Sequence, residues 1–362
     1  SMDYSIIEKR IGVPKLRDRI VSAEEAAALI PDGAVVGLSG FTRAGDAKVV
    51  PLALVERAKK EKFQLDVYTG ASIGPEVDHY MAEAGIIRKR GPYQGEKAMR
   101  NLINQGKILY VDAHLSHNAE LVRQGIIGPI KYAIIEVCAI TEDGLLIPTT
   151  SVGNSPIFAQ YAENIILELN ISHPETLIGI HDIYVPGPQG QREPIPITKA
   201  NQRIGEKGIR VDLDKIKAIV ISEEPDAPSL ITPPDEETQK MADMLLDFFR
   251  SEIKAGRLTK ELMPIQSGVG SVANAVLDGF KESEFENLQV YSECLQDAVF
   301  HLIDAGKVSF ASATSITLTA EAQKHVFGNI DKYIDKICLR PQEISNHPEV
   351  IRRLGLISIN GA

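Results

Sequence analysis

The sequence predicts an α/β fold in two similar domains, each built on a mostly parallel sheet. Short apolar runs typical of buried strands alternate with stretches whose apolar residues follow a helical period. Several of these strands end in small residues, such as Ser39-Gly40 and Ala71-Ser72. Because the strand runs are almost wholly apolar, we expect helices over both faces of each sheet. A chain of 362 residues is too long for one ordinary core, which indicates more than one domain.

Apolar runs bounded by turn residues predict the strands, and amphipathic stretches between them predict the helices. Strands are expected at residues 34–38, 65–68, 108–111, 132–137, 165–169, 183–185, 218–222, 288–291 and 308–311. Helices are expected at residues 47–60, 236–254, 272–280 and 294–304, and a capping box at Ser22 to Glu25 opens an earlier one. Ligands gather at the carboxyl ends of parallel strands, so we expect a site among the small-residue turns there.

A stretch rich in turn residues, 223–235, separates two parts of the chain. We therefore expect an N-terminal domain over residues 1–224 and a second domain over residues 225–362. The second domain holds few predicted strands, and the chain ends at 357–362, straight after one of them. We expect this second domain to be incomplete.

Composition and charge argue against several classes of protein. The formal net charge of −10 argues against nucleic acid as a partner, because phosphate binding needs a basic surface. No apolar run approaches the roughly 20 residues that span a bilayer, so no membrane association is expected. Three cysteines without a C-x-x-C spacing exclude a disulfide framework or a cysteine zinc site, and fit a reducing, cytoplasmic setting. No glycine-rich dinucleotide motif follows a strand, so no nicotinamide cofactor is indicated.

The run Gly268-Val269-Gly270-Ser271 precedes a predicted helix. Glycines in that position can expose backbone N–H groups to an anion. The run is also typical of a tight loop with Ser271 as the helix N-cap, and local sequence alone favours this plainer interpretation.

Glu293 follows the strand predicted at 288–291 and precedes the helix predicted at 294–304. A carboxylate there can be a catalytic group at the carboxyl end of a strand, or it can simply complement the helix dipole. Spacing alone favours the second role. Cys294 could have a lowered pKa at a helix start, but such a cysteine is more often a small buried apolar residue, which is what we expect here.

Two further groups of side chains are candidates for ligand binding. His114 and His117 could ligate a metal with Asp112 or Glu120, but this spacing is common by chance and no metal is expected. The Ser- and Thr-rich run 309–319 could hydrogen-bond a carboxylate substrate, although an exposed strand with hydroxyls on one face is the favoured interpretation.

Longer strings resemble the acetyl-CoA hydrolase/transferase family, in the family's order and along the whole chain. They are Ser39-Gly-Phe-Thr-Arg-Ala-Gly-Asp-Ala-Lys48 with Val49-Val-Pro-Leu-Ala-Leu54, Tyr68-Thr-Gly-Ala-Ser72, Gln266-Ser-Gly-Val-Gly-Ser-Val-Ala-Asn-Ala275, Tyr291-Ser-Glu-Cys-Leu-Gln-Asp297 and Arg340-Pro-Gln-Glu-Ile-Ser-Asn-His-Pro-Glu349. Jointly these strings are specific, and they are similar to the succinyl-CoA:acetate coenzyme A transferase branch of the class I transferases.

The resemblance implies two similar α/β domains and an enzyme that moves coenzyme A between carboxylates such as acetate and succinate. It implies that Glu293 is the nucleophile and forms a glutamyl-CoA thioester, that Ser72 and Asn346 line the site, and that the glycine loop lies near the coenzyme. Coenzyme A is then a substrate, with no metal or nicotinamide cofactor. The family also implies a homodimer.

The chain departs from the family in three places. Ser292 and Cys294 flank the glutamate where Thr and Val are commoner, and the segment 224–229 lacks an arginine often found there. A later glycine-rich loop of the family, which helps to bind coenzyme A, has no counterpart in this sequence. Acyl-CoA hydrolysis, with water as the acceptor, and a truncated, inactive or assembly-dependent fragment are therefore alternatives to the transferase.

Overall fold

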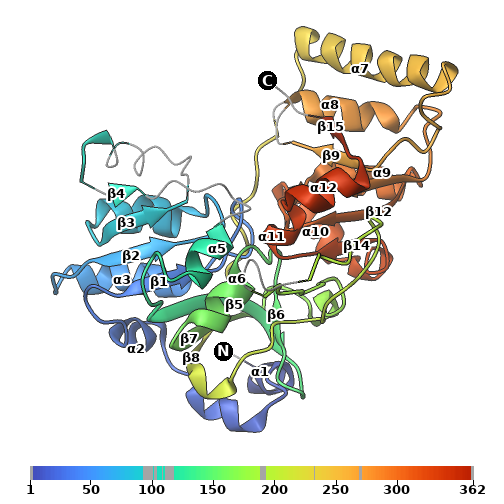
Figure 1. The fold of residues 1–362 in the computed structure, drawn as a ribbon. Helices are drawn as coiled ribbons and strands as arrows, with labels where there is room; N and C mark the ends of the chain where they lie inside the picture. Colours follow the sequence, from blue (N-terminus) through green and yellow to red (C-terminus); the bar gives the residue numbers. More distant parts are fainter. Residues whose placement is uncertain are drawn as a thin grey trace.

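The computed structural model describes residues 3–92, 101, 104–107, 109–110, 118–187, 193–231, 233–268 and 271–359. Two main sheets divide between the two ends of the chain, and the second stands above the first in Figure 1. We call the elements as far as β8 the first part and those from α7 onward the second part. The predicted α/β fold with mostly parallel sheets is confirmed, while the domain boundary after residue 224 stays a prediction.

The first sheet has the strand order β4-β3-β2-β1-β5-β7-β8, with β6 antiparallel to β5 and the other pairs parallel. Its strands are β1 (Val35–Leu38), β2 (Leu65–Tyr68), β3 (Ile87–Gly91), β4 (Leu109–Tyr110), β5 (Tyr132–Ile140), β6 (Leu146–Pro148), β7 (Asn164–Asn170) and β8 (Ile216–Ser222). Every residue of β5 is buried, because helices pack on both faces of the sheet. This burial explains the nearly continuous apolar run in its sequence.

Helices cover the two faces of the first sheet in separate groups. The helices are α1 (Tyr4–Arg10), α2 (Ala23–Ala28), α3 (Val49–Ala58), α5 (Asn118–Arg123) and α6 (Ser155–Tyr161), with a π-helical turn at Glu76–Met81 and 3-10 turns at Pro14–Arg19, Glu175–Leu177 and Leu213–Lys215. Side chains of α2 and α3 share one core with the sheet, and those of α1, α5 and α6 share the other. The capping box predicted at the start of α2 is present, with Ser22 and Glu25 bonded to each other's backbone N–H groups.

The second main sheet is parallel throughout, in the order β14-β12-β10-β9-β15. Its strands are β9 (Ile265–Ser267), β10 (Leu288–Tyr291), β12 (Val308–Ala313), β14 (Ile337–Leu339) and β15 (Ile357–Ile359), and β11 (Cys294–Leu295) pairs separately with β13 (Ser315–Ile316). The helices of this part are α7 (Glu236–Lys254), α8 (Ser271–Phe280), α9 (Asp297–Asp304), α10 (Ala320–Phe327), α11 (Gln342–Ser345) and α12 (Pro348–Leu354), with a 3-10 turn at Ile330–Lys332. Helix α7 packs on α8 at the outer end of the sheet (Figure 1).

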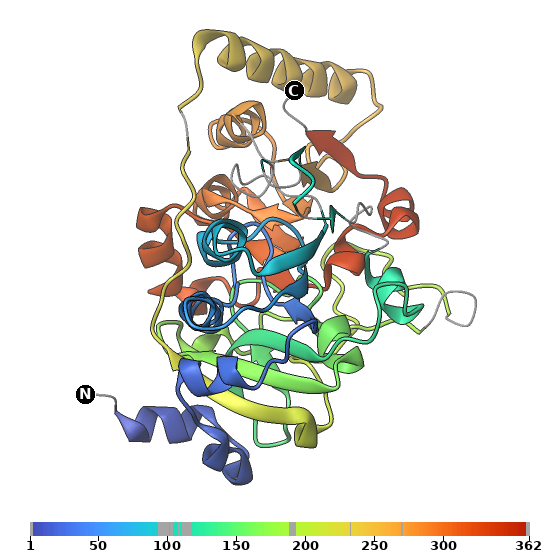
Figure 2. The ribbon, with the colours of Figure 1, turned by 90° about the vertical axis from the view of Figure 1, so that its left-hand side faces the viewer.

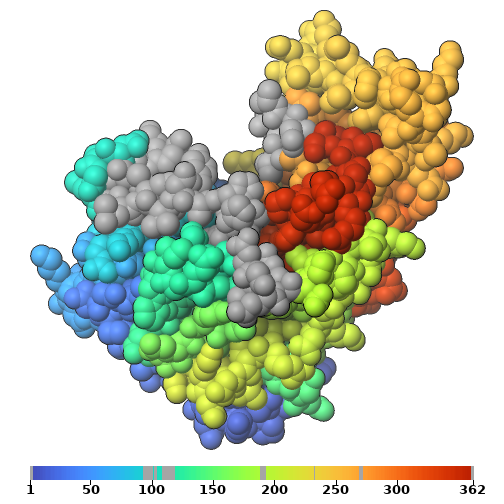
Figure 3. Space-filling view, viewed as in Figure 1, coloured from blue at the N-terminus to red at the C-terminus, as the bar shows by residue number. Residues whose placement is uncertain are grey.

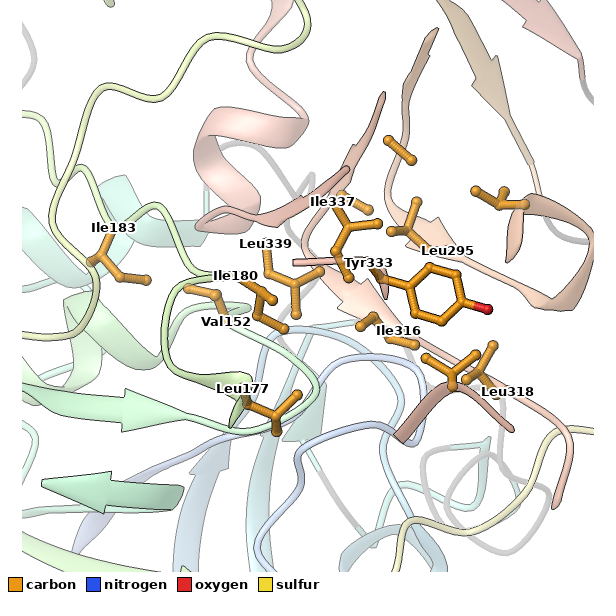
Figure 4. Close-up of a cluster of buried hydrophobic side chains, with 14 of the residues drawn as sticks. Val152, Leu177, Ile180, Ile183, Leu295, Ile316, Leu318, Tyr333, Ile337 and Leu339 are labelled. Carbon is orange, nitrogen blue, oxygen red and sulfur yellow. The ribbon is translucent and has the colours of Figure 1, made fainter. Parts of the chain in front are cut away.

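Apolar side chains from both parts form one continuous core where the sheets meet. Figure 4 labels those from both sides of this joint: Val152, Leu177, Ile180, Ile183, Leu295, Ile316, Leu318, Tyr333, Ile337 and Leu339. On the face shown in Figure 3, red residues of the second part lie directly on yellow-green residues of the first. There Arg353 donates to the backbone carbonyls of Ile195 and Ile197, at 2.6 and 2.7 Å. The two parts are therefore packed as one body.

Polar contacts join the two parts as well. The Arg123 guanidinium donates to both carboxylate oxygens of Glu343, at 2.7 and 2.6 Å, and buried Arg340 pairs with Asp182. The segment after β8 runs along the side of the molecule to reach α7, as Figure 2 shows. Among the residues that the structure describes, no helix combines the length and apolar character that a bilayer crossing requires.

One predicted strand is wrong. Residues 183–185 form only an isolated bridge, between Ile183 and Glu206. The chain here is held by the second part instead, because the Asp182 N–H donates to the Leu339 carbonyl at 2.8 Å and the Asp182 carboxylate pairs with Arg340. The apolar run at 183–185 therefore packs where the two parts meet. A short apolar run has the same pattern in the sequence whether it forms a strand or packs at such a contact.

The buried imidazole of His181 gives a prediction about stability and pH. Its Nε2–H donates to the Thr149 carbonyl at 2.9 Å, and burial lowers the pKa of His181 to about 4. An unfolded histidine has a pKa of about 6.5, so the unfolded chain takes up this proton first as the pH falls. Stability is therefore lost between about pH 6.5 and pH 4, by about 3 kcal/mol from this group, and levels off below that range.

We expect His181→Gln, which keeps a donor for Thr149 but cannot titrate, to remove this part of the pH dependence. Urea unfolding of both proteins at a series of pH values measures it. The difference between their unfolding free energies should change steadily from about pH 6.5 to pH 4, since contributions from other groups cancel. A difference that is constant over that interval would show that His181 does not titrate as its environment indicates.

Candidate active site

A cavity of about 710 Å³ lies where loops of the two parts meet. The first part contributes the turn after β1 and the loop after β2 that carries Ser72. The opposite wall comes from the segment 229–235, the start of α7, Asn274 of α8 and the chain around Cys294. The turns after β1 and β2 lie at the carboxyl ends of parallel strands, which is where the sequence predicts a site.

The turn after β1 reaches across to the second part. Phe41 and Ala44 exchange two backbone hydrogen bonds of 3.0 Å, which close a two-residue turn over Thr42 and Arg43. Both central residues have positive φ, 47° and 67°, although neither is glycine. Such conformations cost roughly 1–3 kcal/mol each and persist only where the surroundings hold them. The Thr42 hydroxyl is held in this way, 2.9 Å from the Thr317 hydroxyl.

Hydroxyls and one thiol form a cluster around Thr42. The Thr42 hydroxyl lies 3.3 Å from the Ser315 hydroxyl and 3.2 Å from the Cys294 sulfur. The run 309–319 is not the exposed strand that local sequence favoured, because only Ser309 is exposed near its start, residues 310–316 are buried, and Ser315 bridges to Ser151 of the first part. The hydroxyls of Ser315 and Thr317 reach Thr42 of the first part, next to the cavity.

Glu293 lies between β10 and β11 and is partly buried. The next residue, Cys294, lines the cavity, while Glu293 itself is not among the lining residues. The Glu293 carbonyl accepts hydrogen bonds from the N–H groups of Thr314 and Ser315, at 2.9 and 3.2 Å. The preceding Ser292 accepts a hydrogen bond on its hydroxyl from a backbone N–H of β9, at 2.8 Å. The main chain that carries Glu293 is thus fixed on both sides.

The helix predicted at 294–304 is wrong at its start. Cys294 and Leu295 form the strand β11, which pairs with β13, and α9 begins only at Asp297. The pairing with β13 keeps the chain extended as far as Gln296, the N-cap residue. Glu293 is consequently four residues before the helix, too far to complement its dipole, which acts within the first turn. Complementing the helix dipole, which is the role that the spacing favoured for Glu293, therefore does not apply.

The other predicted site residues lie on segments that adjoin this place. Ser72 lines the cavity. Gly268 directly follows β9, and its N–H donates to the Ile359 carbonyl at 2.8 Å, while Val269 and Gly270 lie outside the described residues. His114 and His117 also lie outside them.

Asn346 is buried directly after α11. Among the described residues, its side-chain nitrogen has no hydrogen-bond partner. Helix α11 touches both neighbouring segments, because Gln342 donates to the Gly70 carbonyl at 3.0 Å and the Tyr291 hydroxyl donates to the Ile344 carbonyl at 2.8 Å. The structure therefore brings the segments of Ser72, Glu293 and Asn346 together.

A buried cluster of charges, which the sequence analysis missed, fixes the loop between β1 and α3. The Lys48 ammonium lies 3.2 Å from Asp46, 2.7 Å from Glu136 and 3.0 Å from Asp226, all inaccessible to solvent. Burial alone would lower the pKa of Lys48, but these carboxylates raise it well above its usual value. Burial opposes the charge on Asp226, yet Lys48 outweighs it and lowers the pKa of that carboxyl.

The geometry of this cluster also resembles a metal site. Ligand atoms of Glu136, His173 and Asp226 lie within 4.8 Å of one another. The ammonium of Lys48, however, already contacts two of these three residues and supplies the positive charge that their carboxylates need. These residues therefore fit a structural ion cluster better than a metal centre, and the absence of a metal stays a prediction.

The family of the chain follows from its relatives. The model of the acetyl-CoA hydrolase/transferase N-terminal domain matches residues 13–225. The chain is 45% identical to the succinyl-CoA:acetate CoA-transferase of Clostridium kluyveri, over 99% of its own length and 67% of that protein. It is 38% identical to the propanoyl-CoA:succinate CoA transferase of Escherichia coli, over 94% of this chain and 70% of that one. It is also 38% identical to the acetyl-CoA hydrolase of Saccharomyces cerevisiae, over 98% and 69%.

Solved structures agree on the fold. RipA from Yersinia pestis superimposes with a TM-score of 0.69 at 18% identity, over 99% of this chain and 74% of that one. The 4-hydroxybutyrate CoA-transferase from Porphyromonas gingivalis does so with 0.62 at 19% identity, over 96% and 74%. The protein is thus an enzyme of the coenzyme A transferase and acyl-CoA hydrolase class. The chain belongs to the acetyl-CoA hydrolase/transferase family, as the strings in its sequence indicate.

The three cysteines give a test of the site's chemistry. Burial raises the pKa of Cys294 to about 11, of Cys338 to about 11 and of Cys138 to about 12. At pH 8 each thiol is then almost wholly protonated, and a protonated thiol is a poor nucleophile. We expect iodoacetamide to leave all three cysteines unmodified in the native protein at pH 8, and to modify all three in urea. Peptide mass spectrometry measures this, and rapid labelling of native Cys294 would contradict it.

Proposed function

We propose that this enzyme transfers coenzyme A between carboxylates and carries it on Glu293 as a glutamyl thioester. The observation that supports this most directly is the position of Glu293. It is a carboxylate on a fixed main chain, and the residue that follows it, Cys294, lines a cavity at which loops of both parts meet. Covalent catalysis preserves the energy of the thioester and divides one difficult step into easier ones.

In the proposed reaction a Glu293 oxygen attacks the carbonyl carbon of the acyl-CoA, and the coenzyme leaves as a thiolate. This step gives a mixed anhydride between Glu293 and the acyl group. The thiolate then attacks the Glu293 carbonyl, which releases the first carboxylate and leaves the glutamyl-CoA thioester. A second carboxylate attacks that thioester to form a new anhydride, and the thiolate attacks its acyl carbonyl. The products are a new acyl-CoA and free Glu293.

Each tetrahedral intermediate in this sequence carries an oxyanion that needs hydrogen-bond donors. The buried Asn346 side-chain nitrogen is one such donor, because it has no acceptor among the described residues. We propose that Ser72 contacts the acyl group from the opposite wall, since it lines the cavity from the first part. Gly268 follows Ser267, whose N–H donates to the Ser292 hydroxyl, and we propose that it contacts the coenzyme near the thioester. The same contact is proposed for Val269 and Gly270, which lie outside the described residues.

Cys294 is the nearest competitor for the role of nucleophile, since it is next to Glu293 and lines the same cavity. Burial raises its pKa to about 11, and its sulfur is packed against the Thr42 hydroxyl at 3.2 Å. A thiol in this state cannot compete with an ionised carboxylate at neutral pH. We therefore assign the covalent role to Glu293.

Hydrolysis is the second candidate function, and the fungal relatives named acetyl-CoA hydrolase favour it. The two reactions share the proposed steps as far as the thioester. They differ in what attacks that thioester: a carboxylate takes up the coenzyme as a new acyl-CoA, whereas water releases free coenzyme A and regenerates Glu293. Exclusion of water therefore decides between them. A homodimer and a cytoplasmic location, both expected from the sequence, stay predictions.

The nucleophile is tested by trapping. We expect incubation with succinyl-CoA to add the mass of coenzyme A less one water to the peptide that contains Glu293. Glu293→Gln should show no adduct, because an amide cannot attack the thioester. Glu286→Gln, which alters an exposed carboxylate just before β10, is the matched control and should behave like the wild type. An adduct on another residue, or none at all, would reject Glu293 as the carrier.

The acceptor is tested by measuring thioester loss with and without acetate. With succinyl-CoA as donor, we expect consumption to rise at least tenfold when acetate is added, with one acetyl-CoA formed for each succinyl-CoA lost. Free thiol should accumulate slowly in both cases, because water is a poor acceptor in a transferase. Fast release of thiol that does not depend on acetate would identify a hydrolase.

A further inference from the structure

The cavity wall carries one exposed cation that nothing described so far uses. Arg43 follows Thr42 in the strained turn after β1, its side chain is exposed, and it lines the cavity. It makes no ion pair or hydrogen bond with any residue that the structure describes. By contrast, Arg123 and Arg340 at the joint between the parts are both held by carboxylates. Arg43 is therefore available to a ligand in the cavity.

The charges around Arg43 indicate what kind of ligand it can hold. Among the described lining residues Arg43 is the only cation, and the one carboxylate, Asp235, accepts a hydrogen bond from the Thr238 N–H at 2.7 Å as the N-cap of α7. A single guanidinium balances one carboxylate. It cannot balance the several charges of the coenzyme's phosphates next to an acidic side chain. The lining therefore fits a singly charged group better than a polyphosphate.

The position of Arg43 indicates that the carboxylate it binds is not the carboxylate that reacts with Glu293. Glu293 is next in the chain to Cys294, and the Cys294 sulfur lies 3.2 Å from the hydroxyl of Thr42. Arg43 is the next residue of the same turn and is exposed, whereas Thr42 is partly buried. The carboxylate that reacts must reach Glu293 itself. The guanidinium of Arg43 is then placed for a second carboxylate at the other end of the same acid.

We infer that Arg43 is a specificity-determining residue that binds the distal carboxylate of a dicarboxylic acyl group of about the size of succinate. The hydroxyls of Thr42 and Thr317, which are 2.9 Å apart, line the wall between Cys294 and Arg43. They provide polar neighbours for the body of the acid. This inference rests on the proposed function for the identity of the substrate, but the binding of a dicarboxylate can be measured without any turnover.

The test compares succinate with succinamate, which has the same shape but an uncharged amide in place of one carboxylate. Dissociation constants are measured by saturation-transfer NMR on the full chain without coenzyme A, for the wild type, Arg43→Gln and Arg43→Lys. Arg210→Gln is the matched control, since it alters another exposed arginine, outside the cavity lining, that pairs with Glu206. Loss of one charge-assisted hydrogen bond corresponds to about tenfold in affinity.

We expect the wild type and Arg210→Gln to bind succinate about tenfold more tightly than succinamate. Arg43→Gln should bind the two acids equally, with its affinity for succinamate unchanged, and Arg43→Lys should lie between. The inference is overturned if Arg43→Gln keeps the preference for succinate. It is also overturned if the variant weakens the binding of both acids equally, which indicates contact with the reacting carboxylate. ADP is measured in the same way as a phosphate probe, and a variant that weakens only ADP binding overturns the inference in favour of a phosphate contact.

The binding test of Arg43 does not depend on whether Glu293 is the nucleophile. If no adduct forms on Glu293 but the preference for succinate depends on Arg43, the proposed transfer fails and the dicarboxylate subsite stands. If the adduct forms but Arg43→Gln retains the preference, the transfer stands and Arg43 has no part in choosing the acid.

Discussion

The geometry of the site depends on the ion pairs that the buried ammonium of Lys48 makes. It joins three carboxylates from separate segments: Asp46 from the loop after β1, Glu136 from β5 and Asp226 from the segment that leads to α7. Taking these charges out of water costs several kcal/mol for each ion, and the cost is offset only if each finds close partners. The Asp226 carboxylate also accepts the Gly45 N–H at 3.1 Å, so the cluster fixes the chain directly after the turn that carries Thr42.

Glu168 fixes the start of the next helix, α3. Its carboxylate accepts the backbone N–H groups of Lys48, Val49 and Val50, at 2.7 to 3.0 Å, and so caps α3 from the neighbouring strand β7. Burial raises its pKa to about 7 against the effect of these three donors. A single connected network thereby sets the loop, the helix that follows it and the start of the linking segment. The turn that places Thr42 and Arg43 in the cavity wall is therefore supported by that network.

The sequence predicted the fold well where one physical pattern decides the structure. Helix α7 (Glu236–Lys254) and strand β10 (Leu288–Tyr291) have the predicted bounds, because an amphipathic period and a short apolar run between turns each leave little choice. Prediction failed where contacts between segments far apart in the sequence override local preference. Cys294 begins a strand and not a helix because it pairs with β13, and Ser315 is buried where it bridges to Ser151 of the first part. No local pattern carries such information.

Some residues of the candidate site were predicted from the sequence, and others were missed. Resemblance to the family singled out Ser72, Glu293 and Asn346, and the structure brings their segments together. The Lys48 cluster was missed, although a signal was present. A lone glutamate in each of the apolar runs of β5 and β7 is costly unless it is paired, so Glu136 and Glu168 should have been recognised as members of a buried network. The cationic partner of Glu136 could not be identified, because Lys48 lies 88 residues from it in the sequence.

The strand at Cys294 has a consequence for the chemistry of its neighbour. A glutamate in the first turn of a helix would have its charge stabilised by the backbone and would be a weaker nucleophile for it. Glu293 instead follows a strand, and its main chain is held through its carbonyl, which accepts the N–H groups of Thr314 and Ser315. The side chain can then change from carboxylate to anhydride to thioester while the backbone that positions it stays fixed. A rigid support of this kind suits a residue that must form and break bonds several times in one cycle.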